Sequence, residues 1–174
     1  NQGHCHPKIV DAVREQAGKL EQVIFSGFTH GPAEELTDKL LKFTDKALEF
    51  VFYSDSGSTA IEVALKMAIG YHEHSDKPRG KVVALEGGYH GDTFGAMSAG
   101  ARGVFNKVYE PYLFDVTHLP FPSAGKEHKT LQMYKDLLKK HGDDIAALIL
   151  EPLVLGAESK DSARIQIFDT IQQT

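Results

Sequence analysis

The sequence YSDSGSTAIEVA, residues 53–64, decides the fold, because a run of small residues joins an apolar segment to an amphipathic helix. Backbone N–H groups at the start of a helix have no partner within it and lie at the positive end of its dipole. Gly57, Ser58 and Thr59 can therefore present donors to an anion. Asp55 or Ser56 can cap the helix. The stretch predicts either a phosphate-binding helix start or an ordinary capped helix.

Composition indicates a globular protein. The chain has 174 residues, of which 41% are hydrophobic and 25% charged, enough for one domain with a core. Its net charge of -5 argues against nucleic acid as a partner, because binding to phosphate backbones needs a basic face. No Gly-Lys-Ser or Gly-Lys-Thr follows a spaced glycine, so nucleoside triphosphate chemistry is not expected.

The single cysteine, Cys5, excludes an intramolecular disulfide, and no long apolar span or signal-like start is present. We therefore expect a cytoplasmic protein that does not bind membranes. His4 and His6 flank Cys5, but alternating residues of an extended chain point to opposite sides, so we expect no metal site. The chain starts with Asn1, which leads us to expect a piece of a longer protein.

Apolar periodicity predicts a helix from Pro7 to about residue 22 and a second helix from Pro32 that ends before Glu49. Residues 50–53 read as a short buried strand. The helix that follows residues 53–58 is predicted to pack on a sheet through one apolar face, formed by Ala60, Val63, Ala64, Met67, Ala68 and Tyr71.

Two further strands, residues 81–85 and 145–150, alternate with a helix at about residues 131–140. This alternation predicts an α/β fold with a mostly parallel sheet and a ligand site beyond the carboxyl ends of the strands. Three segments are expected to meet at that edge: the turn formed by Ser56, Gly57 and Ser58, residues 86–93, and Glu151-Pro152.

Tyr89 and Glu151 are the candidate side chains at this edge. Tyr89 lies between glycines, where its ring can stack on a flat cofactor ring or pack on its own loop. Glu151 precedes a proline, which favours an extended conformation. Glu151 can orient a cofactor or substrate group, or remain a solvated carboxylate.

Four segments together resemble the class III aminotransferases, with the same order and spacing. They are NQGHCHP (residues 1–7), FYSDSGSTA (52–60), GYHGDTFGAMS (88–98) and EP (151–152). The resemblance covers residues 1 to about 157 and implies part of the large domain of a fold-type I enzyme that uses pyridoxal 5'-phosphate. It also implies a homodimer.

Carried onto this chain, the resemblance implies that Gly57 and Ser58 bind the cofactor phosphate and that Tyr89 lies against the cofactor ring near the substrate. Glu151 matches the family's Glu-Pro strand end. The implied organisation is an N-terminal helical segment (1–48) and the first part of the cofactor-binding domain (49–157). A tail (158–174) departs from the family pattern, and its apolar spacing is compatible with a helix.

Within the family, the sequence is most similar to the branch that transfers an amino group from S-adenosylmethionine to 8-amino-7-oxononanoate, giving 7,8-diaminononanoate in biotin biosynthesis. Alternatives are an ω-aminotransferase for ornithine, 4-aminobutyrate or diaminobutyrate, or a non-catalytic phosphate-binding module. In the family, the Schiff-base lysine follows the Glu-Pro segment at some distance. We expect it beyond this chain, which would then be inactive alone.

Overall fold

The computed structural model describes residues 2–152 and 155. The chain divides into two compact units, Asn1–Phe52 and Tyr53–Thr174. The predicted tail, residues 158–174, lies outside the described residues. In the described part of the chain, no helix has the length and apolar character needed to cross a membrane.

The first unit contains the two predicted helices, and both are shorter than expected. Helix α1 (Pro7–Ala17) has proline at its start, where the missing N–H costs nothing. It ends before Gly18, not near residue 22, because glycine disfavours continuation of a helix. Helix α2 (Gly31–Phe43) ends where Thr44 turns to an extended conformation, with φ -93° and ψ 168°.

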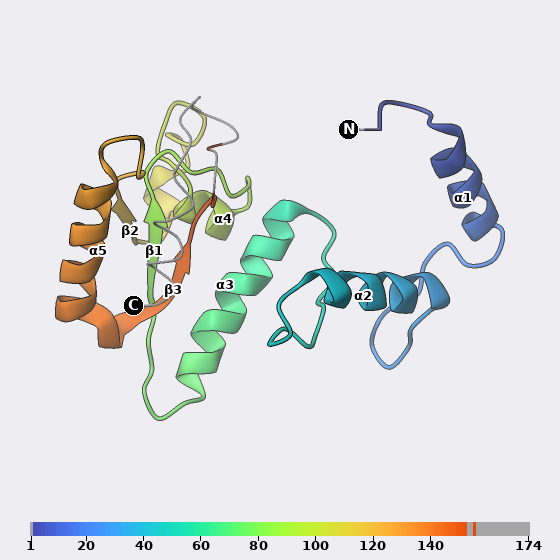
Figure 1. The fold of residues 1–174 in the computed structure, drawn as a ribbon, viewed down its shortest axis with the longest axis horizontal. Coiled ribbons are helices and arrows are strands. Elements are labelled where there is room, and N and C mark those ends of the chain that lie inside the picture. The colour runs from blue at the N-terminus through green and yellow to red at the C-terminus, as the bar shows by residue number, and fades with distance from the viewer. Residues whose placement is uncertain (1, 153–154, 156–174) are drawn as a thin grey trace. The chain divides into compact units, whose positions relative to one another are not determined.

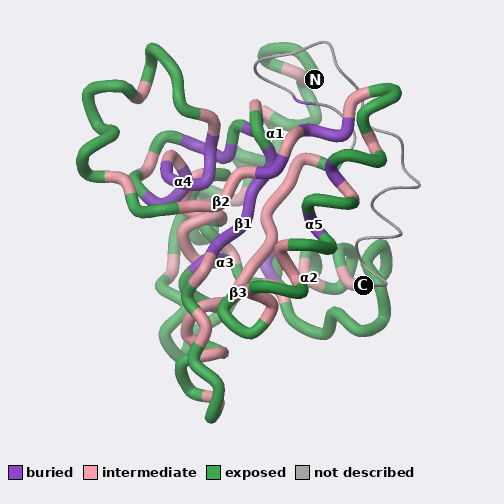
Figure 2. Tube along the Cα trace, turned by 90° about the vertical axis from the view of Figure 1, so that its left-hand side faces the viewer, coloured by how far each residue is buried: buried purple, intermediate pink, exposed green. Residues whose placement is uncertain are grey.

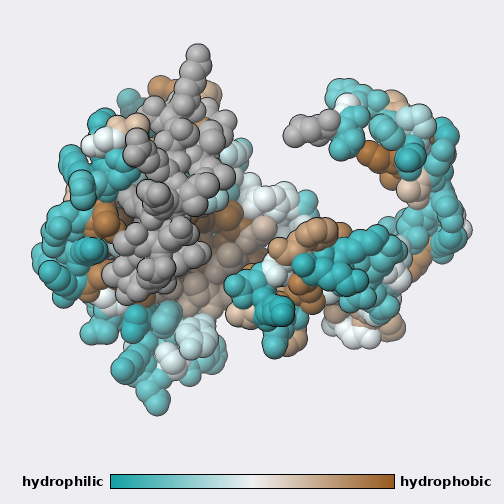
Figure 3. Space-filling model, viewed as in Figure 1, coloured by the Kyte–Doolittle hydropathy of each residue, from teal (hydrophilic) through white to brown (hydrophobic). Residues whose placement is uncertain are grey.

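Both helices of this unit leave apolar side chains exposed. Apolar surface is visible on α1 and on α2 in Figure 3. The exposed side chains are Ile9, Val13, Leu36, Leu40 and Phe43. The periodicity therefore predicted the helices, but these faces are not covered by the described residues.

The predicted strand at residues 50–53 is wrong. The segment has no strand structure, and Phe50 and Phe52 are 89% and 65% exposed. A strand needs a neighbour to accept and donate its hydrogen bonds, and the described residues offer none to this segment. An apolar run of four residues does not by itself distinguish a strand from an extended linker.

The second unit is built on a three-stranded parallel sheet of order β2-β1-β3 (Figure 1). Its elements in chain order are α3 (Gly57–Glu73), β1 (Lys81–Leu85), α4 (Phe94–Ala99), the 3-10 helix η1 (Glu110–Tyr112), β2 (Val116–Leu119), α5 (Glu127–His141), the 3-10 helix η2 (Gly142–Asp144) and β3 (Ile145–Ile149). Val83 of β1 pairs with Thr117 on one side and Leu148 on the other. The predicted α/β class, the parallel sheet and the strand at residues 81–85 are confirmed, and the strand predicted at 145–150 is confirmed but ends at Ile149.

Strand β1 forms the centre of the core, and Figure 2 shows most of it buried. Helices α3 and α4 lie on one face of the sheet and α5 on the other. Val83 and Leu85 pack with Tyr134 of α5, so the alternation of a strand turns Val82 and Ala84 towards α3 and α4. Burial on both faces explains the continuous apolar sequence of this strand.

Helix α3 packs on the sheet as predicted, but through a different face. Leu65 is buried, whereas Met67 and Tyr71 of the predicted face are 51% and 73% exposed. Ile61 and Ile69 lie half-buried on the same side as Leu65. The helix is apolar over most of its circumference, so its periodicity does not identify the packed face.

Candidate functional site

Of the three residues expected to offer donors at the start of α3, Thr59 is used by the helix cap, and the N–H groups of the other two remain unused. Ser56 caps the helix, because its hydroxyl accepts from the Thr59 N–H at 3.2 Å and the Thr59 hydroxyl accepts from the Ser56 N–H at 2.9 Å. The Ala60 N–H donates to the Ser56 carbonyl. Within residues 2–152 and 155, the N–H groups of Gly57 and Ser58 have no acceptor.

The space in front of these donors is open. A Cβ atom placed on Gly57 would meet no atom of the described residues within 4 Å. Because α3 has 17 residues, the full positive end of its dipole adds to the two N–H groups. The Ser58 hydroxyl accepts from the Asp92 N–H at 3.1 Å, so its own proton remains available to a ligand. We call these two N–H groups and the Ser58 hydroxyl the anion site.

The tyrosine loop, residues 86–93, carries Tyr89 beyond the carboxyl end of β1. The Tyr89 N–H donates to Oε1 of Glu151 at 3.3 Å, and Glu151 follows β3. The Tyr89 hydroxyl donates to Oδ2 of Asp92 at 2.8 Å. That hydrogen bond to a carboxylate is the main reason why the pKa of Tyr89 is raised. The ring is half exposed.

These contacts bring three predicted site residues together. Glu151 accepts from Tyr89, Tyr89 donates to Asp92, and Asp92 donates to Ser58, over distances of 3.3, 2.8 and 3.1 Å. Gly57 is the neighbour of Ser58 in the anion site. The hydrogen bonds thus connect the ends of β1 and β3 with the start of α3, which is the edge that the sequence predicted for a ligand.

The tyrosine loop contains a buried histidine, His90. His90 is 9% exposed, and its Nε2 atom has no hydrogen-bond partner among the described residues. Burial lowers the pKa of His90, the negative charge of Glu151 opposes this effect, and His118 adds to it. The imidazole therefore favours its neutral form, which costs less in an apolar surrounding than the charged form.

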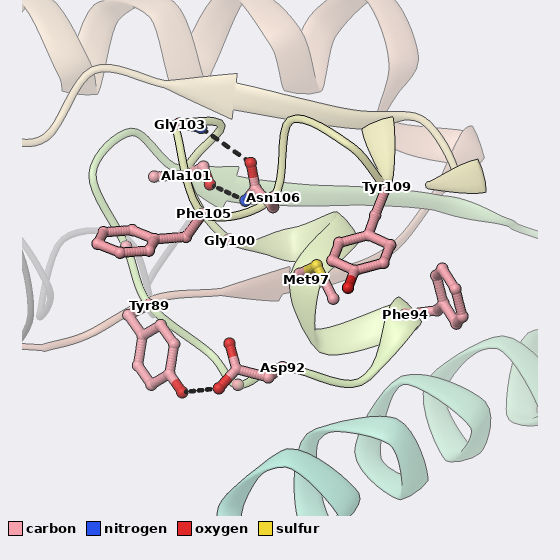
Figure 4. Close-up of a pocket in the computed structure, with 12 residues that line it drawn as sticks. Tyr89, Asp92, Phe94, Met97, Gly100, Ala101, Gly103, Phe105, Asn106 and Tyr109 are labelled. Atoms are coloured by element: carbon pink, nitrogen blue, oxygen red, sulfur yellow. Dashed lines mark hydrogen bonds between the residues drawn. The ribbon is translucent and has the colours of Figure 1, made fainter. Parts of the chain in front are cut away.

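A pocket of about 650 Å³ opens beside Tyr89 (Figure 4). Its lining is mainly aromatic and apolar and includes Tyr89, Asp92, Phe94, Met97, Phe105 and Tyr109. The rings of Phe94 and Tyr109 meet edge to face, with centroids 6.2 Å apart. Asn106 holds the outer loop by donating to the Ala101 carbonyl at 2.6 Å and accepting from the Gly103 N–H at 2.9 Å.

Sequence reasoning missed two residues that organise this edge, Asp92 and Glu62. Asp92 links Ser58 to Tyr89, and Glu62 accepts from two N–H groups of α4. The signal that was available is spacing. Ser58 and Glu62 are four residues apart in the sequence and therefore share one face of α3.

The sequence matches a known protein family and is similar to several named relatives. The sequence pattern described as Aminotransferase class-III matches residues 1–171. A protein of Synechococcus elongatus named adenosylmethionine-8-amino-7-oxononanoate aminotransferase is 46% identical over 177 residues, covering 97% of this chain and 41% of the relative. A protein of the same name from Buchnera aphidicola of Schizaphis graminum is 42% identical over 161 residues, covering 88% and 37%.

Two solved structures show the same fold. The adenosylmethionine-8-amino-7-oxononanoate aminotransferase of Methanocaldococcus jannaschii has a TM-score of 0.89 at 34% identity, over 98% of this chain and 39% of that one. An amine transaminase from an uncultivated Pseudomonas species, in its PLP-bound form, has a TM-score of 0.80 at 28% identity, over 88% and 38%. The chain thus spans about two fifths of the length of these relatives.

Proposed function

Because this chain belongs to the class III aminotransferase family, we propose that its second unit supplies the phosphate site and the ring-facing loop of a pyridoxal-phosphate enzyme. The proposed reaction transfers an amino group from S-adenosylmethionine to 8-amino-7-oxononanoate, which gives 7,8-diaminononanoate for biotin biosynthesis. Support for these substrates comes from the names of the relatives that are 46% and 42% identical.

The observation that carries the proposal is the fit of the anion site to a phosphate group. Gly57 and Ser58 offer two unused N–H donors, and the Ser58 hydroxyl offers a third. Open space in front of Gly57 lets a phosphate approach the backbone. Negative charge at this position is stabilised by the helix dipole. We therefore assign the cofactor phosphate to Gly57 and Ser58.

Tyr89 is the residue that we assign to the face of the cofactor ring and to the neighbouring substrate. Its backbone is fixed by Glu151 and its hydroxyl by Asp92, so the ring is oriented before a ligand arrives. The half-exposed ring borders the pocket, where a substrate can lie beside it. Glu151 accepts a hydrogen bond from the backbone N–H of Tyr89, and we assign it the role of orienting Tyr89.

When bound, the cofactor supplies an electron sink for proton transfer at the substrate amine carbon. This chemistry also requires a lysine, and none is among the described residues that line the pocket. We therefore assign no catalytic residue to this chain. The same proposal includes a homodimer in the cytoplasm as the working form.

A second candidate is an aminotransferase for ω-amines such as ornithine, 4-aminobutyrate or diaminobutyrate. It is favoured by the structural likeness to an amine transaminase, with a TM-score of 0.80. The identity to the S-adenosylmethionine branch, 46%, is higher than the 28% to the amine transaminase, so the ω-aminotransferase is the second choice.

The test uses the full reading frame that encodes this chain, together with the 174-residue chain. Each protein is incubated with pyridoxal 5'-phosphate and reduced with borohydride, and a lysine-linked cofactor is sought by mass spectrometry. The amino donors are then compared. We expect an adduct and transamination with S-adenosylmethionine for the full reading frame. Activity only with ω-amines would favour the second candidate, and no adduct at all would favour a non-catalytic module.

A further inference from the structure

Glu62 makes a contact that the proposed cofactor site does not yet explain. It lies on α3 one helical turn beyond Ser58 and points towards the start of α4. Its Oε1 atom accepts from the Gly95 N–H at 2.6 Å and from the Ala96 N–H at 3.2 Å. The first N–H groups of a helix have no partner within it, so this carboxylate takes the place of a cap that α4 otherwise lacks.

Gly95 has no room for any side chain, because of Glu62. A Cβ atom at Gly95 would lie 2.2 Å from Oε2, 2.7 Å from Cδ and 2.8 Å from Oε1 of Glu62. These three atoms are the nearest neighbours of that position. The absence of a side chain at residue 95 is therefore what allows the carboxylate to reach the backbone.

A matching contact lies one turn earlier on α3. A Cβ atom at Gly91 would lie 2.3 Å from the Ser58 hydroxyl oxygen, which accepts from the Asp92 N–H. Ser58 and Glu62 are thus two side chains four residues apart, and they meet two glycines that are also four residues apart. Two contacts fix both the position and the direction of residues 91–96 along α3. With one contact, the segment could rotate about that point.

We propose that Glu62 is a positioning residue for the cofactor site, which rests on the function proposed above. Its carboxylate holds the segment that leads from Tyr89 and Asp92 into α4 at a fixed place relative to the anion site. Ser58 alone would tie Asp92 to α3 and leave the following turn free. Glu62 thereby sets where the Tyr89 ring lies relative to the phosphate bound at Gly57 and Ser58.

The first experiment measures kinetics and spectra of the full reading frame with its cofactor. In Glu62→Ala, we expect kcat to fall about 10- to 100-fold and the circular dichroism band of the bound cofactor to change, because small displacements at a site have such effects. KM for the amino donor and affinity for inorganic phosphate should change little. Glu62→Gln should restore kcat and the spectrum, because its amide oxygen can accept from both N–H groups.

The matched control is Glu73→Ala, which removes an exposed glutamate from the last turn of the same helix. Gly95→Ala should reproduce Glu62→Ala, because the new methyl group displaces the carboxylate. In the double variant Glu62→Ala with Gly95→Ala, kcat and the cofactor spectrum should be close to those of Glu62→Ala alone. Equal kcat and equal spectra for Glu62→Ala and Glu73→Ala would overturn the proposal, as would loss of phosphate affinity in parallel with kcat.

A second experiment separates this inference from the proposed reaction. Hydrogen exchange at the Asp92 and Gly95 N–H groups is measured in the full reading frame without cofactor. We expect faster exchange at both in Glu62→Ala and wild-type protection in Glu62→Gln. If the wild-type protein fails to transaminate but exchange follows this pattern, the proposed function fails and the positioning role of Glu62 in the apo fold stands. Unchanged exchange at Asp92 in Glu62→Ala refutes that role.

Discussion

Gly91→Ala tests whether the close approach of the tyrosine loop to α3 holds the second unit together. Gly91 has a φ of +130°, a conformation that costs a non-glycine residue about 1–3 kcal/mol. Its new Cβ would also lie 2.3, 2.7 and 2.8 Å from Oγ, Cβ and Cα of Ser58. Because Cα belongs to the helix backbone, rotation of a side chain cannot relieve the overlap, which costs about another 1–3 kcal/mol.

The expected total is a loss of about 2–6 kcal/mol, out of about 5–15 kcal/mol for a typical domain. Urea unfolding of the 174-residue chain, followed by circular dichroism, should show a midpoint lower by about 1–3 M at an m value of about 2 kcal/mol/M. The matched control is Gly142→Ala, at a helical φ of -56°, where no atom in the described part of the chain lies within 4 Å of the new Cβ. It should gain about 0.4–1 kcal/mol. Equal midpoints for Gly91→Ala and the wild type would refute the reasoning.

Three further changes probe the core, the cap and the buried histidine. Leu85→Ala removes a side chain that is 1% exposed at the centre of the core and should lower the free energy of unfolding in urea by about 2–5 kcal/mol. Ser56→Ala removes the cap of α3 and should lower it by about 1 kcal/mol. Burial lowers the pKa of His90 from its usual 6.5, so the unfolded chain binds a proton that the folded chain does not. Stability should therefore fall as the pH falls from above 6.5 towards the lowered pKa, and His90→Gln should reduce this slope, measured by urea unfolding across the pH series.

Each of these has its own control. Met67→Ala, at a half-exposed position of α3, should cost much less than Leu85→Ala, and equal losses would contradict the assignment of the core. Ser56→Asp preserves an acceptor for the Thr59 N–H and should restore stability, so a loss as large as that of Ser56→Ala would argue against capping. For His90→Gln, the control is the wild type unfolded over the same pH series. A wild-type slope in His90→Gln would exclude His90 as its source.

The sheet shows how far apolar patterns predict this fold. Strands β1 and β3 were predicted from their apolar runs, which are typical of parallel strands covered on both faces; β1 is buried and β3 is half-buried. Strand β2, with the sequence VTHL, was missed because Thr117 and His118 interrupt the pattern. It becomes a strand by pairing with β1, and His118 satisfies its Nε2 atom on the carbonyls of Ala99 and Gly100. Such pairing depends on residues distant in sequence.

In the site, too, the residues placed by local sequence were predicted and those placed by distant contacts were missed. Ser58, Tyr89 and Glu151 were predicted from their places at a helix start or after a strand, and the structure joins them by hydrogen bonds. Asp92 and Glu62 were missed because their roles depend on which loop lies against which helix. A single sequence shows that Glu62 is on a helix, but not that the backbone of residue 95 lies within reach of its carboxylate.

The most direct test of the central claim compares two ligands that differ only in a phosphate group. Affinities for pyridoxal 5'-phosphate and for pyridoxal are measured by titration of the full reading frame, in the wild type and in Gly57→Ala. Open space at Gly57 means that the variant should fold normally while its methyl group keeps the phosphate from the two N–H donors. Loss of hydrogen bonds to a charged group predicts affinity for the phosphorylated ligand lower by about 10- to 100-fold, with affinity for pyridoxal unchanged. An equal change for both ligands, or no change for either, would contradict the assignment of Gly57 and Ser58 to the cofactor phosphate.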